Sequence, residues 1–74
     1  MDTFLLFVAE LFEVPVDTLS PDTGYQSIPQ WDSLMQLRLV AEIEEQYNVE
    51  IPIDAIPDIK NLRDFYRYVE GEIQ

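Results

Sequence analysis

The chain has 74 residues, 47% of them hydrophobic, and carries 15 Asp and Glu against 4 Lys and Arg, for a formal net charge of −11. This length fits one small domain near the lower limit for a self-sufficient core, and the apolar share indicates a globular protein rather than a disordered acidic tail. The acidic surface repels the phosphates of nucleic acids and anionic lipids and suits basic protein partners, although it can also serve only to keep a small domain soluble.

The chain contains no Cys and no His. Disulfides, thiolate or imidazole metal ligands, cysteine nucleophiles and histidine general bases are therefore excluded. The start is acidic, unlike a signal peptide, and the longest apolar run, residues 4–9, is too short to span a membrane. We expect a free-standing, cytoplasmic, monomeric protein in which residues 1–74 form a single domain without nucleic acid or membrane partners.

Apolar side chains at helical spacing predict a first helix over residues 3–13. Pro15 should end it, because the residue before a proline leaves the helical region. Residues 14–32 form a long connection that is rich in Pro and in turn-forming side chains. Its scattered apolar residues should hold this connection against the core, since so long a loop in a small domain is usually packed or functional.

Residues 33–47 predict a second helix, which Asn48 should end because Asn tolerates the left-handed conformation. Ser33 and Gln36 fit a capping box, and Gln36 is expected on the exposed face. The expected buried stripe consists of Leu34, Leu37, Val40, Ala41 and Tyr47, widened by Leu39 and Ile43.

Two shorter segments complete the prediction. Residues 54–56 predict one short helical turn that stops before Pro57, and residues 61–71 predict a last helix with Asn61 as its N-cap. Since no segment has a partner strand, the pattern indicates an all-α, four-helix bundle with a short third helix and a long loop between the first two helices.

The segment Asp32-Ser33-Leu34 places a hydroxyl at the start of the second helix. A helix N-terminus favours negative charge and can hold a phosphate. The alternative is that Ser33 only caps the helix, which is a common role for serine.

Asp32-Ser33-Leu34 resembles the phosphopantetheine attachment motif of the acyl and peptidyl carrier protein family. The context strengthens the resemblance: an acidic helix end with an aromatic residue and a turn, the exit Ile51-Pro52, and Leu62 and Asp64 at the start of the last helix. It extends over essentially the whole chain and implies a four-helix bundle with a short third helix, in agreement with the pattern.

The resemblance implies that Ser33 takes 4′-phosphopantetheine from coenzyme A through a separate, magnesium-dependent phosphopantetheinyl transferase. The thiol of this arm would carry acyl or aminoacyl groups as thioesters between loading enzymes and downstream biosynthetic enzymes. The chain itself would be non-catalytic and would bind no metal. Since the chain has no thiol of its own, a thioester carrier of this composition needs an imported one.

Partner contacts are assigned to residues around the start and along the second helix. On the family's pattern, Asp32 is either recognised by the transferase or contacts a metal ion in the transferase complex. The assigned contacts are Trp31, Asp32, Leu34, Met35, Arg38, Glu42 and Glu45. Four of them have plainer alternatives: Trp31 as a cover over the end of the core, Met35 as a half-buried filler, and Glu42 and Glu45 as part of a solvated face.

Three positions depart from the family's pattern: Gln30 stands where many members have Gly, and Met35 and Arg38 stand where fatty acid synthesis carriers are often acidic. The last two favour a partner in polyketide or nonribosomal peptide assembly. Two other function classes stay open. One is a carrier-like domain that acts unmodified as a protein-interaction adaptor; the other is a small acidic enzyme, which the missing His and Cys oppose.

Overall fold

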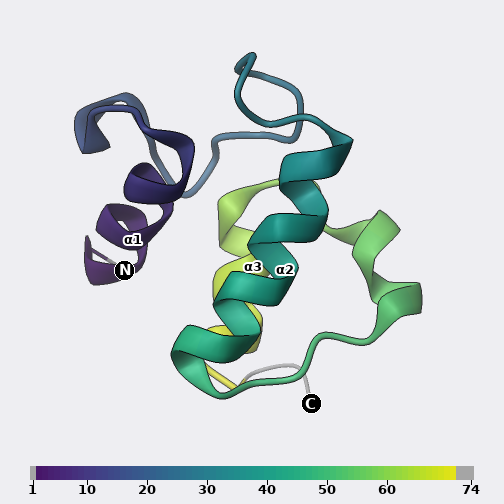
Figure 1. The fold of residues 1–74 in the computed structure, drawn as a ribbon. Coiled ribbons are helices and arrows are strands. Elements are labelled where there is room, and N and C mark those ends of the chain that lie inside the picture. Colours follow the sequence, from purple (N-terminus) through teal and green to yellow (C-terminus); the bar gives the residue numbers. More distant parts are fainter. Residues whose placement is uncertain (1, 72–74) are drawn as a thin grey trace.

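The computed structural model describes residues 2–71, which form α-helices and short 3-10 helices and no β-strand (Figure 1). The elements in chain order are α1 (Asp2–Phe12), η1 (Val16–Thr18), α2 (Ser33–Tyr47), η2 (Ile53–Asp58) and α3 (Leu62–Val69). The predicted all-α fold with a short third helix, here η2, is confirmed.

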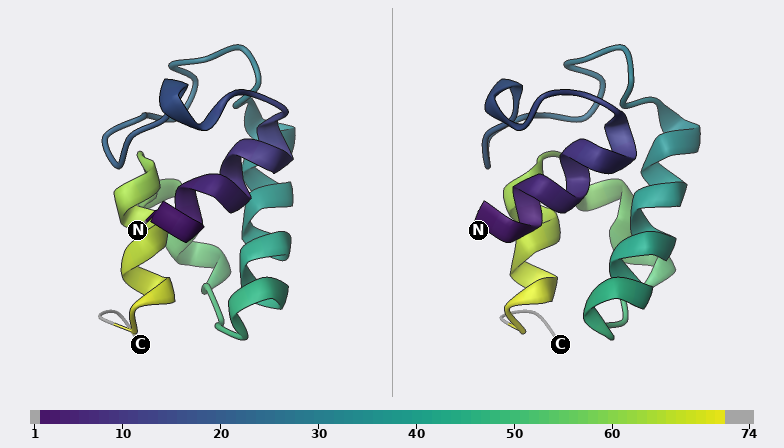
Figure 2. Two further views of the ribbon diagram at one scale, coloured as in Figure 1. Left: turned by 90° about the vertical axis from the view of Figure 1, so that its left-hand side faces the viewer. Right: turned by 60° about the vertical axis from the view of Figure 1, so that its left-hand side comes forward.

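Figure 2 shows how the helices are arranged: α2 and α3 run in nearly the same direction, and α1 crosses them obliquely. The long connection between α1 and α2 passes over the end of the molecule at which α2 begins. This arrangement leaves the first turn of α2 at the edge of the bundle, where the connection reaches it.

The core is built around Trp31, the largest of the fully buried side chains. Its ring centroid lies 5.6 Å from that of Phe12 and 6.3 Å from that of Phe65, so it joins α1 to α3 next to the start of α2. At the other end of the core, Phe4 contacts the rings of Tyr47 and Tyr66.

The phenol of Tyr47 marks the far end of α2. Burial, and secondly the nearby phenol of Tyr66, raise the pKa of Tyr47 above its usual value. Tyr47 lies fourteen positions after Ser33 in the sequence, which corresponds to about 21 Å along a helix. The raised pKa of Tyr47 therefore reflects the aromatic packing at the end of α2 and has no bearing on the start of α2, where Ser33 lies.

The C-terminal ends of α1 and α2 lie at residues in the left-handed conformation, and an Asn side chain caps the start of α3. Glu13 has a φ of 59°, and the N–H of Val14 donates to the carbonyl of Ala9 at 3.1 Å, so α1 ends in a Schellman motif before Pro15 can act. Asn48, with a φ of 55°, ends α2 as predicted. Asn61 caps α3 as predicted, because its side chain accepts a hydrogen bond from the N–H of Asp64 at 2.9 Å.

The predicted buried stripe of α2 is wrong in part. Leu39, Val40 and Ile43 are buried as predicted, but Leu34 is 77% exposed and Leu37 60% exposed, and Ala41 is exposed as well. Gln36, predicted on the exposed face, is only 7% exposed. The buried residues of α2 are Gln36, Leu39, Val40 and Ile43. Both stripes have helical spacing, and the pattern favoured the wrong one because the true face contains a glutamine.

The long connection packs on the core as predicted, since Leu19 and Trp31 are buried in it. The connection is also hydrogen-bonded to the start of α3. The N–H of Tyr25 donates to the carbonyl of Lys60 at 2.8 Å, and the N–H of Leu62 donates to that of Thr23 at 3.1 Å. Arg63 adds an ion pair with Asp22 at 2.8 Å. Both side chains of this pair are largely exposed, so the backbone bonds matter more.

The short third helix is longer than predicted, since η2 continues past Pro57 to Asp58. Pro57 has no N–H, but the N–H groups of Ala55 and Ile59 bond to the carbonyls of Pro52 and Ile56 on either side of it. The 3-10 pattern therefore does not need a donor at Pro57.

Candidate functional site

The N-cap of α2 is Asp32, not Ser33. Asp32 has an extended backbone, and its Oδ1 accepts a hydrogen bond from the N–H of Met35 at 2.9 Å. The predicted capping box of Ser33 and Gln36 is therefore wrong, because the carboxylate one position earlier already takes the capping role. Ser33 becomes the first residue of the helix proper, and its side chain is exposed.

This arrangement leaves the Ser33 hydroxyl available for chemistry. The first amide groups of a helix have no acceptor within it, and Asp32 takes only the one of Met35. The N–H groups of Ser33 and Leu34 can therefore face an anion attached at Ser33. The helix dipole favours negative charge there by roughly 0.3–1 kcal/mol, although the carboxylate of Asp32 opposes it.

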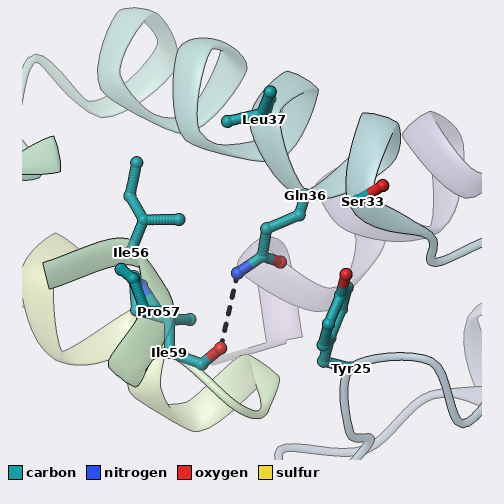
Figure 3. Close-up of a pocket in the computed structure, with 7 residues that line it drawn as sticks. All are labelled: Tyr25, Ser33, Gln36, Leu37, Ile56, Pro57 and Ile59. Carbon is teal, nitrogen blue, oxygen red and sulfur yellow. Dashed lines mark hydrogen bonds between the residues drawn. The ribbon is translucent and has the colours of Figure 1, made fainter. Parts of the chain in front are cut away.

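A pocket of about 280 Å³ lies next to Ser33, between α2, η2 and the long connection (Figure 3). Ser33 stands at one end of this pocket, and the side chains around the rest of it are mainly apolar. The lining residues are Tyr25, Ser33, Gln36, Leu37, Ile56, Pro57 and Ile59. An exposed hydroxyl beside an apolar recess suits a flexible group that has a phosphate at one end and uncharged atoms beyond it.

The inner wall of the pocket contains a buried hydrogen-bond bridge. The Nε1–H of Trp31 donates to Oε1 of Gln36 at 2.7 Å, and Nε2 of Gln36 donates to the carbonyl of Ile59 at 3.3 Å. Leaving such a buried group without its partner costs about 1–3 kcal/mol. The sequence analysis did not predict this bridge. The alternative of a Trp31 covering the core could have indicated it, because a buried Trp usually finds an acceptor for its N–H.

The residues assigned to partner contacts differ in how far they are exposed to solvent. Asp32, Leu34, Arg38 and Glu45 are exposed, and Met35 and Glu42 are partly buried. Trp31 is fully buried, so its assignment as a partner contact is corrected in favour of the alternative that it covers the end of the core.

Two exposed apolar side chains were not among the predicted contacts. Leu37, which was predicted to be buried, lines the pocket and is 60% exposed, and Ile53, at the start of η2, is 84% exposed. Together with Leu34 they are the exposed large apolar side chains of α2 and η2.

Two further findings concern the described residues. Within residues 2–71, no group of three or more Asp, Glu, His or Cys is placed to hold a metal ion. The helices in the same part of the chain are too short or too polar to cross a membrane.

Comparison with known proteins decides the family. The family described as a phosphopantetheine attachment site matches residues 2–69. The chain belongs to this family. It is 32% identical over 74 residues to an acyl carrier protein of Helicobacter hepaticus (strain ATCC 51449 / 3B1), a match that covers 96% of this chain and 97% of that protein.

A second relative, an acyl carrier protein of Thermobifida fusca (strain YX), is 24% identical over 70 residues, covering 95% of this chain and 89% of that protein. No solved structure matches the chain. As a member of the phosphopantetheine attachment family, the chain is a non-catalytic carrier with a covalently attached 4′-phosphopantetheine, and it works with a phosphopantetheinyl transferase and biosynthetic enzymes.

The capping role of Asp32 can be separated from any role in transferase recognition. Replacing Asp32 with Ala should lower the free energy of unfolding by about 0.5–2 kcal/mol, whereas Asp32→Asn, which keeps a capping oxygen, should change it much less. Urea unfolding followed by circular dichroism measures both. Equal stability of Asp32→Ala and the unchanged protein would contradict the capping role. Slow modification of a stable Asp32→Asn variant would assign the charge to recognition.

Proposed function

We propose that Ser33 is the residue that carries the 4′-phosphopantetheine arm. The observation that supports this most strongly is that Ser33 is exposed at the first position of α2 while Asp32 caps the helix in its place. The Ser33 hydroxyl is therefore not needed to cap the helix. It also borders the pocket of Figure 3, in which part of an attached arm can lie.

Attachment needs little from the chain itself. The bond from Ser33 Oγ to phosphorus forms as the pyrophosphate bond of coenzyme A breaks, adenosine bisphosphate leaves, and the hydroxyl proton passes to the transferase or to water. The first-turn amides of α2 then face the new phosphodiester. The arm supplies a thiol, which this chain lacks, for holding acyl or aminoacyl groups as thioesters.

We infer further that the chain serves polyketide or nonribosomal peptide-type biosynthesis as a single, monomeric domain. The support comes from the surface of α2 next to Ser33, where Arg38 is exposed and Met35 is half-buried. An exposed Arg38 repels a strongly basic docking surface and fits a partner that places a carboxylate opposite it. Glu42 and Glu45 follow on the same helix and suit basic groups on that partner.

A second candidate function is that of an unmodified adaptor. Leu34 and Leu37 favour it, because they are three residues apart on α2, are both exposed, and can together contact a protein whether or not Ser33 is modified. The two functions differ in whether the chain gains a covalent group.

Intact-protein mass spectrometry distinguishes them. The chain is incubated with a broadly active phosphopantetheinyl transferase, magnesium and coenzyme A, and then weighed. We expect a gain of one phosphopantetheinyl group and of one titratable thiol. An unchanged mass, with a known carrier protein modified in the same tube, would leave the adaptor function standing and contradict the carrier proposal.

Arg38→Glu tests the partner assignment. Since Arg38 is exposed, its replacement should change the free energy of unfolding by no more than about 0.5 kcal/mol. We expect slower loading by a partner enzyme with an acidic docking surface and faster loading by one with a basic surface. Steady-state rates across such a panel measure this, with Arg67→Glu on α3 as the matched charge reversal. Unchanged rates throughout would contradict a docking role for Arg38.

A further inference from the structure

The pocket beside Ser33 ends at the bridge formed by Trp31, Gln36 and the carbonyl of Ile59. We propose that Gln36 is a specificity-determining residue that closes this pocket toward the core, so that the chain carries short acyl or aminoacyl groups and does not take a long alkyl chain into its interior. The inference rests on the proposed attachment at Ser33 and adds the class of cargo to it.

The position of Gln36 supports this role. Its side chain extends from α2 across the pocket toward Ile59, and the hydrogen bond between them is drawn in Figure 3. Both residues line the pocket, and both are almost fully buried, at 7% and 3% exposed. Together they form its inner wall, while Leu37, Ile56 and Pro57 lie along its more open side.

The region behind the bridge is the aromatic part of the core. Trp31 is fully buried and packs against Phe12 and Phe65. A chain that entered the core from the pocket would therefore have to pass Gln36 and displace Trp31. No buried side-chain polar atom among the described residues lacks a hydrogen-bond partner, so the bridge is complete as it stands.

Opening the bridge would expose polar atoms to hydrocarbon. The indole N–H, the amide of Gln36 and the carbonyl of Ile59 would lose their partners, and an alkyl chain offers no donor or acceptor in exchange. A short acyl group avoids this penalty, because it can remain in the outer part of the pocket. The phenol of Tyr25 also lines the pocket, and it could bond to a polar group there.

The bridge contains the only Trp of the chain, which makes its state directly observable. A broadly active transferase can be supplied with acetyl-, hexanoyl- or dodecanoyl-coenzyme A, and each product is confirmed by intact mass. We expect the Trp31 emission maximum to be the same in all three forms, and the melting temperature to differ by less than about 1 °C between the acetyl and dodecanoyl forms. A steady rise in melting temperature with chain length, or a shift in Trp31 emission, would overturn the proposal.

Gln36→Ala tests the residue itself, with Gln46→Ala as the matched control from the exposed face of the same helix. In Gln36→Ala we expect the dodecanoyl form to melt at least about 4 °C above the acetyl form, and in Gln46→Ala we expect no such difference. A Gln36→Ala variant that folds and shows no dependence on chain length would also overturn the proposal. If that variant does not fold, the series on the unchanged protein decides alone.

The experiment separates this proposal from the one on which it depends. If no acyl form can be made while a known carrier protein is modified in the same tube, the attachment itself fails. If all forms are made and long chains stabilise the unchanged protein, attachment stands and only the limit set by Gln36 fails.

Discussion

The Ser33→Ala variant is expected to lose phosphopantetheinylation completely while it keeps its fold. Alanine offers no oxygen for the phosphodiester bond, and position 33 is exposed, so no packing is lost. Asp32 still caps the helix through the N–H of Met35, and alanine is a good helix former. The free energy of unfolding should therefore change by no more than about 0.5 kcal/mol. Intact mass after transferase treatment and urea unfolding measure the two quantities.

Ser27→Ala is the matched control for this variant. Ser27 is also exposed, but it lies in the long connection, where its hydroxyl donates to the carbonyl of Gly24 at 2.6 Å. Ser27→Ala should be modified like the unchanged protein. A full mass gain in Ser33→Ala would contradict the assignment of the site, and loss of the gain in both variants would point to an indirect effect.

Trp31→Ala is expected to be the most destabilising of the substitutions considered. Truncating a fully buried Trp typically lowers the free energy of unfolding by about 3–5 kcal/mol. The contacts with Phe12 and Phe65 would be lost, and Oε1 of Gln36 would lose its donor. A single core in a domain of this size rarely supplies more than about 3–5 kcal/mol, so little stability would remain. The variant should therefore be largely unfolded.

Trp31→Phe separates packing from hydrogen bonding. It keeps an aromatic ring in the core but removes the N–H that Gln36 accepts. We expect a smaller loss than for Trp31→Ala, with the unsatisfied amide accounting for about 1–3 kcal/mol of it. Urea unfolding followed by far-ultraviolet circular dichroism measures both variants. A loss of less than about 1 kcal/mol in Trp31→Ala would contradict the central place given to this residue.

The main helices could be predicted because their signals are local. The apolar repeat of α1, the left-handed end of α2 at Asn48 and the cap of α3 at Asn61 depend on neighbouring residues alone. The resemblance to the carrier family rests on one short motif and on its context along the chain, and the match over residues 2–69 confirms it.

The face and the cap of α2 could not be predicted, because both depend on the packed fold. Gln36 is buried only because Trp31 and Ile59, from segments before and after α2, supply its hydrogen-bond partners. Leu34 and Leu37 are apolar yet exposed, which hydrophobic periodicity cannot represent. Asp32 and Ser33 are both good caps by residue type, and only the backbone conformation shows that Asp32 takes the role.

The central claim is that the arm is attached to Ser33, and the most direct measurement is fragmentation of the modified protein in the mass spectrometer. The chain has three serines, Ser20, Ser27 and Ser33, so the alternatives of the same chemistry are few. We predict that every fragment containing Ser33 carries the phosphopantetheinyl mass and that fragments ending before residue 33 do not. A group located on Ser20, Ser27 or any other residue, with Ser33 unmodified, would contradict the claim.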